Sequence, residues 1–227
     1  KTLVDAKASL DKGGDPRTTR LFTAAMCGEA AEIQSLLQDK ASVDARESIF
    51  EATPLYYAAR YGHSAAVDVL IDNKAVVDAK NAHGGTPLAN AIHGGHVAVV
   101  QALIDAKADL YGCEDVEPIY EAARKGNPAV VKLLLDHITK ITVYERCETP
   151  LNYAAQEGRS AVAQLLIDAK VDVDWQDQDR QTALHYAAEG GYTTTMQVLI
   201  NAKANVDARD SKKQTPLSIA ASHGHTG

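Results

Sequence analysis

The chain has 227 residues, a formal net charge of −7 and 45% hydrophobic residues, among them only two Phe and one Trp. The acidic balance argues against a nucleic-acid partner, whose binding surface normally carries a basic stripe, and against electrostatic anchoring to a membrane. No apolar run approaches the roughly 20 residues of a spanning helix, so we expect no membrane insertion.

The cysteines indicate a reducing compartment. Cys27, Cys113 and Cys147 form an odd set without CxxC spacing, which suits neither a disulfide framework nor a zinc knuckle. We therefore expect free thiols and an intracellular protein, cytoplasmic or nuclear.

One ten-residue pattern recurs along the whole chain. Thr-Pro-Leu-Tyr-Tyr-Ala-Ala-Arg-Tyr-Gly at 53–62 reappears in related form at 149–158, 182–191 and 215–224, with looser copies from 19, 86 and 117. The glycine near the end of each copy marks the period, which is 31 to 34 residues: Gly28, Gly62, Gly95, Gly126, Gly158, Gly191 and Gly224. A regular period of this length is typical of repeat architectures.

Each unit is predicted to contain two short helices. The first begins at the Thr-Pro step, where Thr caps free amides and Pro costs no hydrogen bond, and it ends at the marker glycine. The second carries apolar residues at three- and four-residue spacings, such as Val67 and Leu70, which form one buried stripe. A Val-Asp segment and a polar turn follow, and we call this connection a finger.

The pattern resembles ankyrin repeats. The motif Thr-Pro-Leu-x-x-Ala-Ala-x-x-Gly-His occurs at 53–63 and at 215–225 and is specific to that family. The resemblance covers essentially the whole chain. It implies an all-α repeat solenoid of stacked helix-turn-helix units joined by β-hairpin-like fingers.

The resemblance also implies one ankyrin repeat domain over 1–227. Its complete repeats are expected at about 13–46, 47–79, 80–112, 113–143, 144–176 and 177–209, with partial repeats at 1–12 and 210–227. Partial repeats at both ends predict that the segment is a piece of a longer array.

The sequence departs from the family pattern after the second helix, where the family usually has glycine. Lysine stands there instead, and in a left-handed conformation it would cost about 1 kcal/mol per unit relative to glycine. The positions are Lys7, Lys40, Lys74, Lys107, Lys170 and Lys203.

No pattern of catalytic residues is present. Phosphate-binding loops, HExxH and GxSxG motifs are absent from the sequence, so we expect no enzyme activity, no cofactor and no small-molecule substrate. His83, His93 and His96 lie close in sequence, but no Cys or carboxylate at ligand spacing completes a metal site, and His96 occupies the Gly-His position of its repeat.

The function that the resemblance implies is binding of a protein or peptide on a concave face of finger tips and first helices. Tyr and Arg are frequent interface anchors, so the run from Tyr57 to Tyr61 is the preferred hot spot. The predicted partner-binding residues are Ile49, Phe50, Tyr57, Arg60, Tyr61, His93, Arg124, Lys125, Tyr153, Glu157, Trp175 and Tyr186.

We expect the isolated domain to be monomeric. Two alternatives to this scaffold function stay open. The array could target a larger enzyme, channel or secreted effector whose active domain lies outside the segment. It could also read a modified lysine through Trp175, which replaces the alanine of other repeats, although packing of Trp175 is the favoured interpretation.

Overall fold

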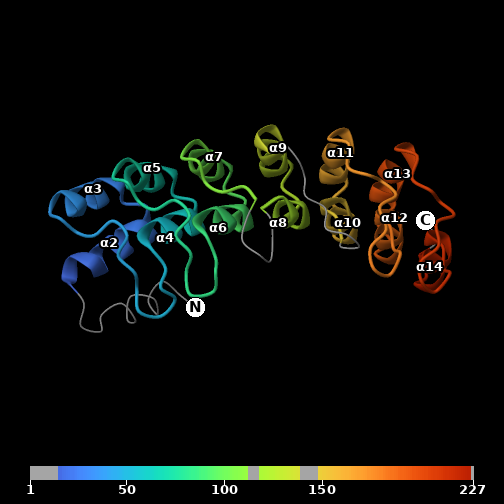
Figure 1. The fold of residues 1–227 in the computed structure, drawn as a ribbon, viewed down its shortest axis with the longest axis horizontal. Coiled ribbons are helices and arrows are strands. Elements are labelled where there is room, and N and C mark those ends of the chain that lie inside the picture. Colours follow the sequence, from blue (N-terminus) through green and yellow to red (C-terminus); the bar gives the residue numbers. More distant parts are fainter. Residues whose placement is uncertain (1–14, 112–117, 139–147, 226–227) are drawn as a thin grey trace. The chain divides into compact units, whose positions relative to one another are not determined.

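The computed structural model describes residues 15–111, 118–138 and 148–225. The chain divides into two compact units, unit 1 (1–114) and unit 2 (115–227). Every regular element in the described ranges is an α-helix (Figure 1). The predicted all-α repeat fold is thereby confirmed within each unit. The predicted site residues all lie in the described ranges, whereas Lys7, Cys113 and Cys147 lie outside them.

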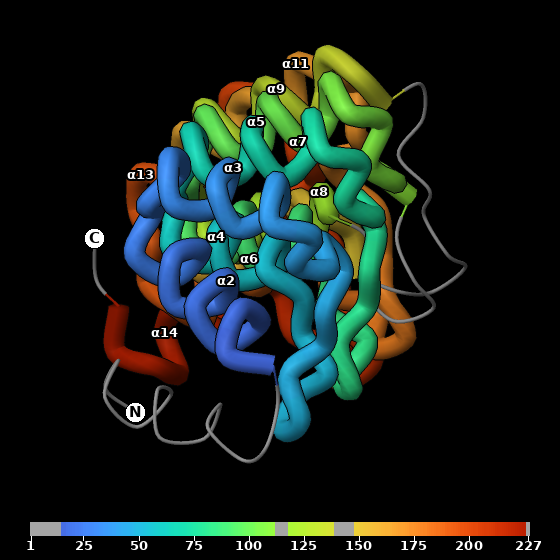
Figure 2. Tube along the Cα trace, turned by 90° about the vertical axis from the view of Figure 1, so that its left-hand side faces the viewer, coloured from blue at the N-terminus to red at the C-terminus, as the bar shows by residue number. Residues whose placement is uncertain are grey.

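Unit 1 alternates first and second helices of three repeats. Figure 2 shows the first helices in one row and the second helices in another. The helices are α2 (Pro16–Cys27), α3 (Ala30–Gln38), α4 (Pro54–Tyr61), α5 (Ser64–Asp72), α6 (Pro87–Gly94) and α7 (Val97–Asp105).

Unit 2 repeats the same alternation and closes on a first helix. Its helices are α8 (Pro118–Lys125), α9 (Pro128–His137), α10 (Pro150–Gln156), α11 (Ser160–Asp168), α12 (Ala183–Glu189), α13 (Thr193–Asn201) and α14 (Pro216–Ser222).

The predicted helix signals work as expected. The hydroxyls of Thr53, Thr86 and Thr149 each accept a hydrogen bond from the amide three residues later, and Pro follows directly. The marker glycines are left-handed, with φ between 66° and 80°. A Cβ at Gly28 would lie 2.6 Å from the Nδ1 atom of His63, so space also favours glycine there.

Lysine does occupy the left-handed position after most second helices. Lys40, Lys74, Lys107, Lys170 and Lys203 have φ between 65° and 70°. The predicted conformation is confirmed, and the strain is partly offset because a cation at a helix C-terminus favours the helix dipole.

Small side chains form the core between neighbouring first helices. Ala58 and Ala59 on α4 are fully buried, as are Ala154 and Ala155 on α10. Leucines on the second helices, such as Leu70 on α5, are also fully buried. Small side chains at the alanine positions let α4 and α10 pack closely against the neighbouring first helices.

Histidines after three of the marker glycines, His63, His96 and His225, each contact the preceding repeat. The Nε2 atom of His63 lies 3.0 Å from the Met26 carbonyl oxygen, and that of His225 lies 2.9 Å from the Glu189 carbonyl oxygen. Each ring reaches from the residue after a marker glycine to the last turn of the first helix of the preceding repeat, α2 for His63 and α12 for His225.

The fingers are tight turns linked by single backbone hydrogen bonds. The Ala82 amide donates to the Phe50 carbonyl at 2.7 Å, and the Ser211 amide donates to the Asp179 carbonyl at 2.8 Å. These bonds join neighbouring fingers in the manner of a β-ladder, but no strand is assigned in the ranges that the structure describes.

Candidate partner-binding surface

A buried carboxylate fixes the finger that carries Ile49 and Phe50. Glu47 is only 6% exposed, and its Oε2 and Oε1 atoms accept from the amides of Ile49 at 2.7 Å and Phe50 at 2.6 Å. The Ala52 amide donates to the same Oε1 at 3.3 Å. The turn is therefore held by side-chain bonds, while the Ile49 and Phe50 side chains remain 49% and 38% exposed.

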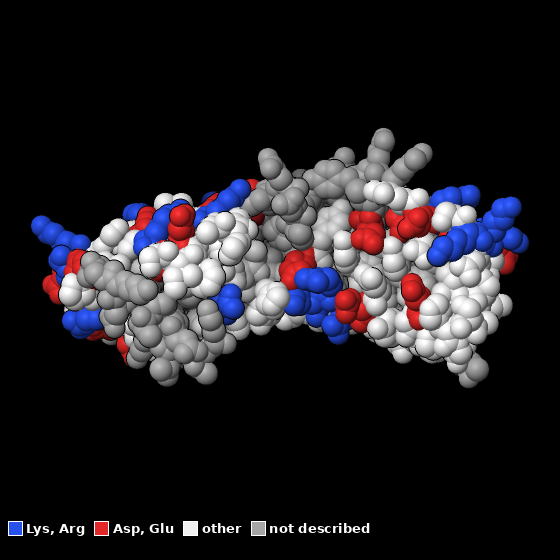
Figure 3. All heavy atoms as spheres, turned by 90° about the horizontal axis from the view of Figure 1, so that it is seen from below, with Lys and Arg blue, Asp and Glu red and all other residues white. Residues whose placement is uncertain are grey.

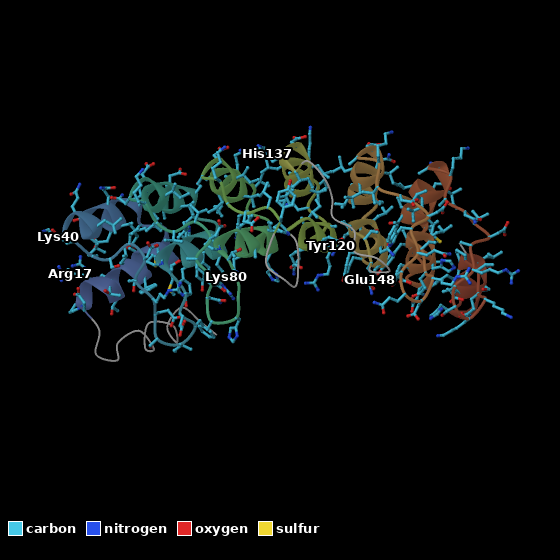
Figure 4. All side chains as sticks on the ribbon, in the orientation of Figure 1. Arg17, Lys40, Lys80, Tyr120, His137 and Glu148 are labelled. Atoms are coloured by element: carbon cyan, nitrogen blue, oxygen red, sulfur yellow. The ribbon has the colours of Figure 1, made fainter. Side chains whose placement is uncertain are left out.

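The finger at 80–85 contacts the finger that carries Ile49 and Phe50. The Phe50 ring lies 6.0 Å from the His83 ring, and the Arg46 Nη1 atom donates to the carbonyl oxygens of Glu51 and Lys80, at 3.0 and 2.9 Å. Figure 4 places Lys80 at the finger side of unit 1. The two fingers thus present one apolar and basic tip.

Tyr57 connects the finger to the end of α4. Its ring packs edge-on against Phe22 at 6.0 Å and against Tyr56 at 5.6 Å. Burial, and next the negative charge of Glu47, raise the pKa of the Tyr57 hydroxyl well above its usual range, while Arg60 opposes this rise. The half-buried Tyr57 therefore supports the surface more than it projects from it.

The last turn of α4 supplies exposed groups. Arg60 is exposed, Tyr61 is 39% exposed, and the Tyr61 ring lies 6.4 Å from the His63 ring. The Arg60 carbonyl oxygen is 3.2 Å from His96 Nε2, which anchors the backbone and leaves the guanidinium at the surface. We name Ile49, Phe50, Tyr57, Arg60 and Tyr61 the finger–α4 surface.

The remaining predicted residues lie on other elements. His93 is exposed in the last turn of α6 in unit 1. In unit 2, Arg124 Nη2 pairs with Glu121 at 2.8 Å, and Lys125 lies 3.8 Å from the same carboxylate. Their charge is thus partly neutralised within α8.

Two further predicted residues of unit 2 lie on α10 and directly after it. The Tyr153 ring packs edge-on against Tyr120 at 6.0 Å, and Figure 4 shows Tyr120 on α8. The exposed Glu157 lies 4.0 Å from Arg159, at the limit of an ion pair. Figure 3 shows both signs of charge over unit 2, with Lys and Arg gathered at its C-terminal end.

Tyr186 is the predicted contact residue with the least exposed side chain. It is 8% exposed, and its hydroxyl lies 2.6 Å from Asp177 Oδ2 and 2.9 Å from Glu148 Oε1. Burial, then these two hydrogen bonds, raise the pKa of Tyr186 far above its usual range. A packing role within unit 2 accounts for this residue.

Trp175 is half-buried at the base of a finger. A lysine-binding cage needs several aromatic walls, and Tyr144, which the sequence assigns to the preceding finger, lies outside the described residues. The reader hypothesis therefore stays a prediction.

Sequence reasoning missed the side chains that shape the finger turns. Asn81 and Asp177 each accept from the amides two and four residues later, at 2.8 to 3.0 Å, and Asp210 accepts from the Gln214 amide at 2.7 Å. A signal was present, because Asn81, Asp177 and Asp210 each stand five residues before the marker Thr. Glu47 does the same work from six residues before it.

Metal-binding groups and membrane-spanning helices are two further features to compare with the described ranges. No group of three or more His, Cys, Asp or Glu side chains there is placed to hold a metal ion. None of the helices described is both long and apolar enough to cross a membrane.

Comparisons with known proteins agree on the repeat type. A family model described as ankyrin repeats (3 copies) matches residues 2–81, 21–111, 76–145, 107–177 and 151–227. No curated protein matches this sequence.

Among solved structures, the human ASB11 ankyrin repeat domain is 26% identical to this chain. The match has a TM-score of 0.81 and covers 91% of this chain and 92% of that one. The ankyrin repeat domain of Bcl-3, described as a unique member of the IkappaB protein family, is 22% identical with a TM-score of 0.76, over 92% of this chain and 95% of that one. The second likeness concerns the fold alone.

The matched segments together span almost the full sequence, and the capped helix pairs show the same repeat in three dimensions. This chain belongs to the ankyrin repeat family.

Proposed function

We propose that this chain is a non-catalytic scaffold that binds a segment of a partner protein on the finger–α4 surface of unit 1. Ankyrin repeat domains are general protein–protein interaction modules, which supports the class of function. The free cysteines expected from the sequence favour an intracellular site of action, in the cytoplasm or nucleus.

The observation that carries this placement is the exposed Ile49–Phe50 pair. Solvent-facing turns normally carry polar residues, and the equivalent turn in unit 2 holds Asp179 and Arg180. Glu47 holds the turn through its carboxylate, so the fold itself does not require two apolar side chains at the tip. An apolar pair on a rigid turn suits insertion into, or covering by, a partner.

The side chains around the Ile49–Phe50 pair indicate which residue types the partner segment carries. Tyr61 gives a flat aromatic face, and the exposed guanidinium of Arg60 can take a carboxylate in a bidentate pair. The proposed partner segment therefore places an apolar side chain against Phe50 and an acidic one near Arg60.

The test uses a partner captured by the intact chain and identified by mass spectrometry, with its affinity measured by titration. Phe50→Ser combined with Tyr61→Ala removes two partly exposed rings outside the helical core. We expect it to weaken binding at least tenfold with unchanged helical circular dichroism, since buried aromatic contacts dominate interfaces. Val206→Ser is the matched control, because Val206 is 48% exposed but lies in unit 2. Equal affinity of the double variant and the control would rule out this surface.

A further inference from the structure

A shallow groove runs between two second helices of unit 1, away from the fingers. It has a volume of about 500 Å³ and lies between α5 and α7, which Figure 2 shows side by side. Its lining contains three carboxylates and no Lys or Arg: Asp68, Ile71, Asp72, Ala98, Gln101, Ala102, Asp105 and Ala106.

Asp68 makes this groove differ from the equivalent places in other repeats. The position six residues after the marker glycine holds Gln or Lys in the other described second helices: Gln34, Gln101, Lys132, Gln164 and Gln197. Gln101 and Gln164 donate to Asp105 and Asp168 four residues later, both at 2.9 Å. With Asp68 in that position, the same bond to Asp72 cannot form between two ionised carboxylates.

The Asp68–Asp72 pair destabilises α5, the helix that carries it. Like charges four residues apart destabilise a helix by about 0.2–0.5 kcal/mol. Asp72 is also the last residue of α5, where a negative charge opposes the helix dipole. Within the described residues neither carboxylate is within ion-pair distance of a basic group. No ion pair there offsets the repulsion between the two carboxylates.

The floor of the groove suits close approach of another helix. Ala98 and Ala102 on α7 and Ala106 directly after it follow one another at four-residue intervals, and Ile71 of α5 lines the same groove. Small side chains at this spacing leave room for a helix backbone, as the paired alanines do between the first helices of the core.

We propose that this groove binds a cationic amphipathic helix of a partner protein, with Lys or Arg at positions i and i+4 beside a face of small apolar residues. Asp68 and Asp72 lie one turn apart, about 6 Å along the axis, which matches the rise between such a basic pair. The apolar face of the partner covers the alanine floor, and its two cations neutralise the like-charged pair. This surface is separate from the finger–α4 surface.

The probe is a fluorescein-labelled, alanine-rich peptide of about 16 residues with Lys pairs four apart, long enough for helix formation. Its binding to the intact chain is measured by fluorescence anisotropy at about 0.05 and 0.15 M NaCl, where screening differs. We expect saturable binding that weakens at the higher salt concentration. A peptide of identical composition with the Lys pairs two apart faces its charges to opposite sides and should bind more weakly.

The decisive variant is Asp68→Gln, which installs the side chain that other repeats already carry and should fold at least as well. We expect it to weaken peptide binding about fivefold, as for one lost exposed ion pair at its upper range. Asp68→Gln combined with Gln164→Asp moves the like-charged pair to α11 at constant net charge, and we expect no recovery.

Three results would overturn the proposal. They are unchanged binding by Asp68→Gln, equal binding of both peptides, and full recovery in the charge-swapped double variant, which would indicate attraction to net charge alone. Phe50→Ser should leave peptide binding unchanged, which separates this groove from the proposed scaffold surface.

Discussion

Asn152 on α10 has a buried amide nitrogen without a hydrogen-bond partner. His185 occupies the same place in the next repeat, where its Nδ1 atom bonds Thr182 and its Nε2 atom lies 3.3 Å from the Gln214 carbonyl oxygen of the following finger. Asn152 bonds Thr149 in the same way, but its side chain is too short to reach the next finger.

Asn152→His is therefore expected to raise the free energy of unfolding by about 1 kcal/mol, because it adds one hydrogen bond and removes an unsatisfied buried amide. Urea denaturation followed by circular dichroism measures the change. The reciprocal His185→Asn should lower stability by a similar amount. A destabilised Asn152→His protein would show that the space beside Asn152 does not admit an imidazole.

Lys74 carries backbone strain at φ 67°. Lys74→Gly should relieve it and raise stability by up to about 1 kcal/mol, less the entropy that glycine adds to the unfolded chain. Thermal denaturation tests this change. Lys132→Gly, inside α9, is the contrasting control and should lower stability by about 1 kcal/mol.

Individual residues differ in how well the sequence predicts them. The left-handed lysines follow from their place after the helix, because that conformation is a local property of the chain. The burial of Tyr186 does not follow, since Tyr57 and Tyr153 share its register and are only half-buried. Asp177 and Glu148 decide the difference, and they approach Tyr186 only in the folded unit.

At the scale of elements, the ring of His63 ties α5 to the end of α2. His63→Ala removes the contact with the Met26 carbonyl oxygen and uncovers Gly28. We expect a loss of about 1–2 kcal/mol in the free energy of unfolding, measured by urea titration. His83→Ala, at an exposed finger position, should change stability by less than about 0.5 kcal/mol. Similar losses of unfolding free energy in both variants would show that His63 does not link the two repeats.

Tyr186 on α12 bonds Asp177 of a finger, and we expect it to make the stability of unit 2 depend on alkaline pH. Its pKa is raised on folding, so the neutral hydroxyl is favoured in the folded state. The stabilisation is complete below the unfolded pKa of about 10 and is lost as the pH rises beyond that value.

Denaturation between about pH 8 and 11 should therefore show a steeper loss of stability in the wild-type chain than in Tyr186→Phe. We expect the variant to be less stable at neutral pH, because it removes the hydroxyl that donates to Asp177 Oδ2 and Glu148 Oε1. Parallel pH profiles of the two proteins would remove Tyr186 as the source.

The helices themselves were predictable, because Thr, Pro and Gly act within a few residues of each helix end. The links between repeats were less so. The hydrogen bond from the Ala82 amide to the Phe50 carbonyl oxygen joins residues more than 30 positions apart, and no local pattern announces it. Exposure of Ile49 and Phe50 was predicted from their place in a finger, whereas the role of Glu47 beneath them was not.

At the scale of the whole molecule, the sequence divides into two compact units with the same repeat in each. Repeats of this kind contact mainly their neighbours, so a binding surface can be assigned to one unit from that unit alone. The finger–α4 surface meets this condition, since its residues and supports all lie between Phe22 and His96.

Hydrogen–deuterium exchange of the chain with and without its captured partner tests the central claim most directly. The account predicts that partner binding slows exchange of the amides in the 46–52 turn and in the last turn of α4, with unit 2 unchanged. Protection confined to unit 2, with residues 46–62 unaffected, would contradict it.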